Sequence, residues 1–199
     1  MIPVFPTCYF GSIAYFRALA GHKRVLIEAK ERFPKQTYRN RSTILGANGL
    51  LSLTLPVNRP NDSDSLTEEV LLSGRSWRND HWRSIRSAYE SSPYFDHYGM
   101  EIEELIYSDI ASLLHFNMNI TERICQWLTL PVQMERSTSF LPVRERDPRT
   151  ELVQKQMLPS ENAPYIQVFP SKNSYTPSIS ILDAVLCHGP LARNLVFQP

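Results

Sequence analysis

The sequence predicts a single α/β domain, and three observations favour that class. Two short apolar segments, residues 2–9 and 24–28, flank a segment with helical apolar spacing, which predicts a β-α-β opening. An Asn48-Gly49 pair between β-prone segments predicts a hairpin. Most of residues 79–130 has helical periodicity. We therefore expect one mixed sheet covered by a layer of helices.

The β-α-β opening begins with residues 2–9, although Pro3 and Pro6 favour an edge or irregular strand. Ser12 can cap a helix that ends at Gly21. The second strand, residues 24–28, should run parallel to the first, because a helical crossover joins them. Ligands of α/β proteins commonly bind at the carboxyl ends of such strands.

The Asn48-Gly49 pair predicts a type I′ turn with a two-residue loop, which would place Thr43 opposite Thr54 and Arg41 opposite Pro56. Because side chains alternate along a strand, each hairpin face has its own composition. The core face would carry Ile44, Gly46, Leu51, Leu53 and Leu55, and the polar face Arg41, Thr43, Leu45, Ser52 and Thr54.

A cluster of polar and cationic side chains precedes this hairpin. If the first strand extends back to Arg39, then Arg39 and Arg41 lie on the polar face above a floor of hydroxyl groups. Two guanidinium groups placed so would form a clamp for a phosphate or carboxylate. The alternative is a solvated sheet face on which the arginines pair with nearby acids.

A helix is expected from Asn79 or Asp80 to Ser91, with His81, Ile85 and Tyr89 on one face. His81 and Tyr89 could be catalytic groups at the edge of a pocket. Alternatively, His81 helps to close the helix start and Tyr89 is an amphipathic core residue. Further helices are expected over residues 94–117 and 120–130.

Residues 1–130 are thus expected to form the main α/β domain. Residues 131–164 lack periodicity and are rich in proline, which predicts either a disordered connector or a lid. Residues 165–199 would complete the same domain with a strand, residues 165–169, that carries Gln167, and a helix, residues 180–187. Asp183 follows Ser180 by three residues and fits a capping box at the start of that helix.

Composition bounds the function. The net charge is only +1, but residues 16–49 hold eight basic and two acidic side chains, which favours an anionic ligand at that half. Stable nucleic-acid binding is not expected, because aromatic and basic residues do not interleave. No metal-ligand spacing and no cofactor motif stands out.

Cys8, Cys125 and Cys187 are scattered, and no stretch is long and apolar enough to span a membrane. A cytoplasmic protein is expected. The sequence does not indicate its oligomeric state.

With these features identified, the chain resembles the WbqC-like family. The matching elements extend over most of the sequence. They are Pro6-Thr7, residues 9–11, Tyr15-Phe16, residues 35–41, Asn48-Gly49, residues 53–57, Trp77, His81, Tyr89, residues 93–95, Tyr165, Gln167, Phe169, residues 180–183 and Gly189-Pro190.

The resemblance implies a role in bacterial O-antigen or related polysaccharide synthesis, as an acyl or aminoacyl transferase that adds glycine or another acyl group to an amino sugar. His81 would then be the general base, with Tyr89 beside it. The substrate-binding residues would be Lys35, Gln36, Tyr38, Arg39, Asn40, Arg41 and Gln167.

The alternative is a non-catalytic module that binds a nucleotide-sugar, a lipid-linked phosphate or a biosynthetic enzyme. In either case the expected partner is an anionic small molecule, such as a nucleotide-sugar, an adenylate or a carrier phosphate. One observation separates the two hypotheses. In an enzyme His81 and Tyr89 should line the same pocket as the two arginines, and in a binding module they should pack away from it.

Overall fold

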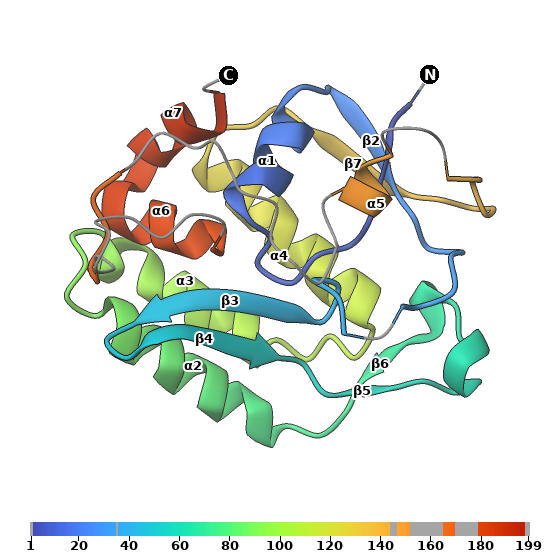
Figure 1. Cartoon of the computed structure of the whole chain (residues 1–199), viewed down its shortest axis with the longest axis horizontal. Helices are drawn as coiled ribbons and strands as arrows, with labels where there is room; N and C mark the ends of the chain where they lie inside the picture. Colours follow the sequence, from blue (N-terminus) through green and yellow to red (C-terminus); the bar gives the residue numbers. More distant parts are fainter. Residues whose placement is uncertain (1, 35, 144–146, 152–164, 170–178, 198–199) are drawn as a thin grey trace.

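A three-stranded parallel sheet forms one end of the molecule in the computed structural model, which describes residues 2–34, 36–143, 147–151, 165–169 and 179–197 (Figure 1). Strand β1 (Val4–Phe5), helix α1 (Ile13–Ala20) and strand β2 (Arg24–Ile27) form the predicted β-α-β unit. The strands are parallel, with Val4 opposite Leu26. The Ser12 side chain caps α1 by accepting a hydrogen bond from the Tyr15 backbone N–H at 3.3 Å.

Strand β7 (Gln133–Arg136) completes this sheet beside β2. It lies in the stretch for which the sequence predicted a connector or a lid. Residues 144–146 and 152–164 of that stretch lie outside the described residues. Helix α5 (Pro148–Glu151) packs against β1, so the described part of the stretch adds to the β-α-β unit.

Strands β3 (Arg41–Gly46) and β4 (Gly49–Thr54) form the predicted hairpin, with a different turn. Only Gly49 has a positive φ there, +104°, which fits a loop in which a glycine follows a type I turn. Each β3 residue therefore faces a β4 residue two positions earlier than expected, and Thr43 faces Ser52. An even shift keeps every side chain on its predicted face.

The core face of the hairpin is only partly as predicted. Ile44, Leu53 and Leu55 are buried, but Leu51 near the turn is 42% exposed. Leu45 on the opposite face is buried, because the chain also covers that face near the turn. The hairpin pairs with no further strand in the described part of the chain, so it stands beside the parallel sheet and does not join it in one mixed sheet.

A second small antiparallel pair, β5 (Val57–Asn58) and β6 (Leu71–Leu72), follows the hairpin. Two 3₁₀ turns, η1 (Asp62–Asp64) and η2 (Thr67–Glu69), lie between these strands. The α/β class is confirmed. The strands of the described residues are divided among three small sheets that share one hydrophobic core.

Three helices follow: α2 (Ser76–Tyr89), α3 (Phe95–Tyr107) and α4 (Leu113–Trp127). In Figure 1, α2 runs below the hairpin and α4 lies above it. Helix α2 begins three residues earlier than predicted. The helix expected over residues 94–117 is interrupted after Tyr107, and Ser112 caps α4 by accepting a hydrogen bond from the His115 backbone N–H.

Helix α6 (Ile181–His188), a 3₁₀ turn η3 (Gly189–Leu191) and helix α7 (Ala192–Phe197) close the fold against α1 and β3. Residues 165–169 form no strand, in contrast to the prediction. Among the described residues, none of the helices is long and apolar enough to cross a membrane.

Candidate functional site

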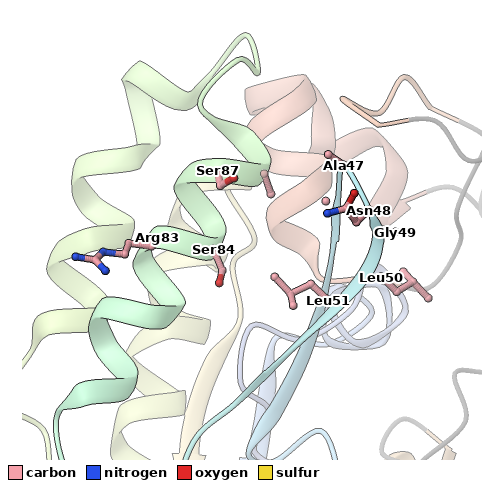
Figure 2. Close-up of a pocket in the computed structure, with 10 residues that line it drawn as sticks. Ala47, Asn48, Gly49, Leu50, Leu51, Arg83, Ser84 and Ser87 are labelled. Carbon is pink, nitrogen blue, oxygen red and sulfur yellow. The ribbon is translucent and has the colours of Figure 1, made fainter.

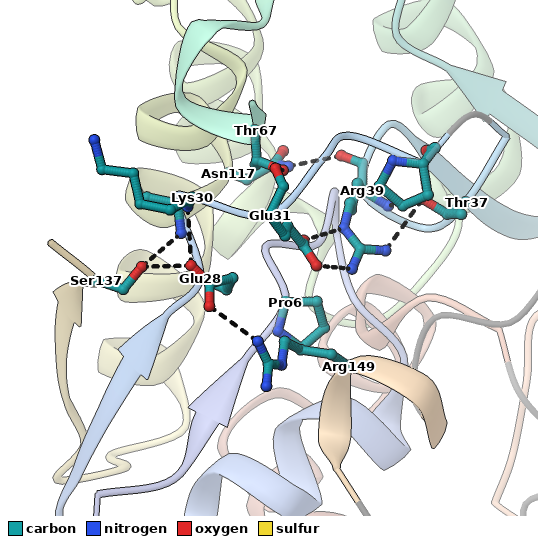
Figure 3. Close-up of polar contacts among 12 residues, drawn as sticks. Pro6, Glu28, Lys30, Glu31, Thr37, Arg39, Thr67, Asn117, Ser137 and Arg149 are labelled. Atoms are coloured by element: carbon teal, nitrogen blue, oxygen red, sulfur yellow. Dashed lines mark hydrogen bonds and ion pairs between the residues drawn. The ribbon is translucent and has the colours of Figure 1, made fainter. Parts of the chain in front are cut away.

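Arg39 does not form the predicted clamp with Arg41. Strand β3 begins at Arg41, and Arg39 lies in the preceding turn, with only 3% of its surface exposed. Its Nε and Nη2 atoms donate to the two carboxylate oxygens of Glu31 at 2.6 and 2.9 Å (Figure 3). The strand does not extend back because Asn40 closes a turn onto the Thr37 carbonyl.

The Asn40 side chain also stabilises the fold and does not face a ligand site that the structure describes. Its side-chain nitrogen donates to the Leu55 carbonyl at 3.0 Å, which ties the base of the hairpin together. The carbonyl of Arg39 accepts a hydrogen bond of 2.7 Å from the Asn117 side chain in α4 (Figure 3). Neither Arg39 nor Asn40 lines the hollow that contains Arg41, and Lys35 lies outside the described residues.

Arg41 lines an open hollow of about 170 Å³. The guanidinium forms no ion pair with the described acids, and its Nε atom is buried without a hydrogen-bond partner in the described part of the chain. The other lining residues supply hydroxyl and amide groups, and they are Gln36, Thr37, Tyr38, Thr43 and Ser52. A guanidinium beside hydroxyl groups and an amide suits a phosphorylated or carboxylated sugar.

His81 is buried away from that hollow, within an aromatic cluster with Trp77 and Tyr9. A hydrogen bond of 2.9 Å joins its Nδ1 atom to the Tyr9 hydroxyl. Burial lowers the pKa of His81 to about 4, although an interaction with the Thr54 backbone acts in the opposite direction. The imidazole is therefore neutral at pH 7.

Tyr89 and Gln167 contribute to a second buried polar cluster, which is centred on Asp183. Oδ2 of Asp183 accepts hydrogen bonds from the Tyr165 hydroxyl at 2.6 Å and from Nε2 of Gln167 at 3.0 Å. The Tyr89 hydroxyl accepts a hydrogen bond of 3.4 Å from the Leu45 backbone N–H and interacts with the same carboxylate. Burial raises the pKa of Asp183.

Asp183 does not complete the predicted capping box. The Ser180 side chain does cap α6, by accepting a hydrogen bond from the Leu182 backbone N–H at 3.2 Å. The backbone N–H of Ser180, which a capping box would give to Asp183, is bound instead to the Thr43 carbonyl at 2.8 Å. The carboxylate of Asp183 thus remains available for the cluster.

The carboxyl edge of the parallel sheet is filled by a network of charged side chains (Figure 3). Glu28, which follows β2, accepts hydrogen bonds from Ser137 at 2.6 Å and from Arg149 at 2.9 Å. Arg149 also pairs with Asp147 at 2.7 Å. Arg149 thus fills the strand edge at which α/β proteins commonly bind ligands.

A larger hollow, of about 380 Å³, lies between the hairpin turn and α2 (Figure 2). It is lined by residues 46–51 together with Arg83, Ser84, Ser87 and Ala88. The Ser84 hydroxyl donates to the Asp80 carbonyl of its own helix, and Figure 2 shows the Arg83 side chain directed away from the hairpin. This hollow therefore presents fewer groups for recognition than the Arg41 hollow.

The structure thus divides the predicted site residues among three places. Gln36, Tyr38 and Arg41 line one hollow, His81 lies in an aromatic cluster, and Tyr89 and Gln167 meet Asp183. Within the described residues, no three His, Cys, Asp or Glu side chains are placed to hold a metal ion. Asp183 belongs to the Ser180–Asp183 element, and that element is the sequence signal that could have identified it. The signal was not used because helix capping already explained an aspartate at this position.

Comparison with known proteins gives two matches. The model of the WbqC-like protein family matches residues 7–158. A protein from Mycobacterium tuberculosis (strain ATCC 25618 / H37Rv), named Uncharacterized protein Rv1507c, is 24% identical over 131 residues, which cover 63% of this chain and 55% of that protein. The chain thus spans about half the length of this relative. No solved structure matches the chain.

Proposed function

The chain belongs to the WbqC-like protein family, and from that premise we propose that it acts in bacterial surface polysaccharide synthesis, with the Arg41 hollow as the site for an anionic sugar derivative or activated donor. The finer proposal is an acyl or aminoacyl transferase that acts on an amino sugar, with glycine as one candidate acyl group. The free thiols of Cys8, Cys125 and Cys187 agree with the proposed cytoplasmic location, where the reducing environment keeps thiols unpaired.

The observation that carries the proposal is the guanidinium of Arg41, which forms no ion pair with the described acids and lies in an open, hydroxyl-lined hollow. A guanidinium binds phosphate or carboxylate through two parallel hydrogen bonds. Thr43 and Ser52 face each other across the hairpin and provide hydroxyl groups beside it, and Gln36 provides an amide. The volume is below the roughly 300–1,000 Å³ of pockets that enclose a drug-sized ligand. The hollow therefore suits one charged group or one sugar ring of a larger ligand.

A second candidate function is the non-catalytic binding module, and the positions of His81 and Tyr89 favour it. Acyl transfer to an amine requires a group that accepts a proton. The described residues that line the Arg41 hollow include no carboxylate and no imidazole. The catalytic roles of His81 and Tyr89 thus stay predictions. The binding residues retained in the proposal are Gln36, Tyr38 and Arg41, together with Lys35, which lies outside the described residues.

Calorimetric titration with nucleotide-sugars, an aminoacyl-adenylate analogue and a lipid-phosphate analogue tests the proposed binding. We expect Arg41→Ala to weaken the binding of the best ligand about tenfold or more, because a charge-assisted hydrogen bond contributes about 1.5–3 kcal/mol. Arg86→Ala is the matched control, because Arg86 is an exposed arginine paired with Glu90. Equal binding by the wild type and Arg41→Ala would contradict the proposal.

Mass spectrometry separates the two candidate functions. The protein is incubated with an amino sugar and an activated glycyl donor, and an amide product that depends on Arg41 supports the transferase. Tight binding of the ligand without any product, over the same series of donors, supports the binding module.

A further inference from the structure

Asp183 is a buried acid that forms no ion pair with the described lysine and arginine side chains. Its side chain is 1% exposed, hydrogen bonds from Tyr165 and Gln167 reach Oδ2, and the Tyr89 hydroxyl also interacts with the carboxylate. Oδ1 has no hydrogen-bond partner in the described part of the chain. We propose that Asp183, with Tyr89, Tyr165 and Gln167 around it, binds the primary amine of the acceptor and takes a proton from it.

The chemistry of an unpaired buried carboxylate favours an amine as the ligand. A buried charge is costly unless a cation or several hydrogen bonds compensate it. The two donors on Oδ2 compensate part of the charge, and an ammonium group at Oδ1 would compensate the remainder. The other ionisable groups that face Asp183 are Tyr89 of α2, Tyr165, and Cys187 and His188 of α6. Burial raises the pKa of Tyr89 and of Cys187, so both of these groups are neutral at pH 7.

Asp183 and the Arg41 hollow lie along the same strand. The edge of β3 that does not pair with β4 binds the start of α6 through the Thr43 carbonyl, and it binds Tyr89 through the Leu45 N–H. Thr43 also lines the hollow. The five strand residues from Arg41 to Leu45 span roughly 13 Å. One extended substrate, or a donor and an acceptor side by side, could therefore contact both places.

The segment that binds Oδ2 of Asp183 reaches the surface of the protein. Tyr165 and Gln167 belong to a segment without helix or strand, and Ile166 between them is 81% exposed. Figure 1 shows α6 beside β3, on the side of the hairpin opposite to α2. In the proposed complex the amine enters beside this segment and binds Oδ1, while Tyr165 and Gln167 keep their hydrogen bonds to Oδ2.

The proposed step is a balanced proton transfer. The acceptor enters as an ammonium ion, one proton passes from its nitrogen to the Asp183 carboxylate, and the products are a neutral amine and a carboxylic acid. The nitrogen lone pair that is released is the nucleophile that acyl transfer requires. Burial, which raises the pKa of Asp183, makes its carboxylate a stronger base than an exposed aspartate.

This inference rests on the proposed transferase function for its biological meaning, but amine binding can be measured separately. Ligand-observed NMR with D-glucosamine, and with N-acetylglucosamine as the neutral analogue, tests it in the wild type, Asp183→Asn and the exposed control Asp96→Asn. We expect glucosamine to bind the wild type and the control, and to bind Asp183→Asn about tenfold more weakly or worse. N-acetylglucosamine should not bind at this site. Equal glucosamine binding by Asp183→Asn, or equal binding of the two sugars by the wild type, would overturn the inference.

Tyr165→Phe provides a second readout, which also decides the matter if Asp183→Asn does not fold. The Tyr165 hydroxyl stabilises the carboxylate and lowers the pKa of Asp183. Its removal should therefore raise this pKa and move the acid limb of glucosamine binding to higher pH. A purely structural role would leave the limb in place, and that result would overturn the inference.

The Arg41→Ala variant distinguishes the two proposals. If no anionic sugar binds the Arg41 hollow and glucosamine still binds through Asp183, the proposed donor site fails and the amine site stands. If anionic sugars bind through Arg41 and glucosamine binding does not depend on Asp183, the proposed donor site stands and the amine site fails.

Discussion

Arg39 and Arg41 are two residues apart, but their guanidinium groups have different environments. Arg39 is enclosed and bound through two hydrogen bonds to Glu31, whereas Arg41 borders an open hollow and forms no ion pair with the described acids. The carbonyl of Arg39 is also bound, by Asn117 of α4. The first arginine therefore belongs to the framework that supports the hairpin, and the second to the surface that a ligand can reach.

Arg39→Met and Arg41→Ala should consequently affect different properties. Arg39→Met leaves the Glu31 carboxylate without its partner, and loss of one member of a buried ion pair costs about 3–5 kcal/mol. Arg41→Ala should change the free energy of unfolding by about 0.5 kcal/mol or less, as surface substitutions usually do. Urea denaturation measures both. If Arg39→Met is as stable as the wild type but does not bind the ligand, Arg39 is a binding residue and its assignment to the framework is wrong.

The hairpin shows how much local sequence can predict. The Asn48-Gly49 pair located the turn, and alternation assigned side chains to faces correctly although the register differed by two positions. Side chains alternate between the two faces of a strand, so a change of register by two residues leaves each side chain on the same face. The environment of Arg39 could not be predicted in this way. Glu31 lies outside the hairpin, and only the folded chain brings its carboxylate to Arg39.

His81 should make the protein acid-sensitive. The pKa of His81 is about 4 in the folded protein, against an ordinary value of 6.5. Between these values the unfolded chain binds more protons than the folded protein, so stability falls as the pH falls from 6.5 to 4. The full loss is roughly 3 kcal/mol.

Urea denaturation of the wild type and His81→Gln across this pH range measures the contribution of His81. We expect a flatter dependence in the variant and an unchanged one in His97→Gln, because His97 is exposed. Parallel curves for the wild type and His81→Gln would show that His81 is not the group responsible.

Gly189 is held against Tyr94 in a backbone conformation that favours glycine. Its φ is +56°, and a Cβ atom there would lie 2.3 Å from Cε1 of Tyr94. Gly189→Ala should therefore destabilise the protein by about 3 kcal/mol or more, from backbone strain and the steric clash. Gly46→Ala is the control, because the nearest atom to its Cβ would be 3.8 Å away. Thermal unfolding that shows equal loss in both variants would contradict this account.

The elements that the sequence did not predict depend on contacts between distant residues. Strand β7 has no alternating apolar pattern, and it is a strand because Gln133–Arg136 pairs with β2. Likewise, Asp183 has an adequate local explanation as a cap, and only the approach of Tyr165 and Gln167 reveals the polar cluster. Propensity and periodicity describe neighbours in sequence, so neither could identify these arrangements.

The Glu28–Arg149 ion pair should anchor the segment after β7 to the parallel sheet. Both side chains are at most 2% exposed, and Glu28 also accepts hydrogen bonds from Ser137 and from the Leu141 backbone N–H. Arg149→Met leaves Glu28 with a buried charge that lacks its cation, which should cost about 3–5 kcal/mol. Hydrogen exchange should become faster at Leu141, while the amides of α4 change only with global stability.

An exposed ion pair between β2 and β7 provides the control. Arg24 of β2 and Glu135 of β7 pair at 2.6 Å, but their side chains are about half exposed, so Arg24→Met should reduce the stability much less than Arg149→Met does. The double variant Glu28→Gln/Arg149→Met should lose less stability than the sum of the two single variants, because each single change leaves an uncompensated buried group. Additive losses would mean that Glu28 and Arg149 stabilise the fold independently, and the segment would then be held by its backbone and apolar contacts.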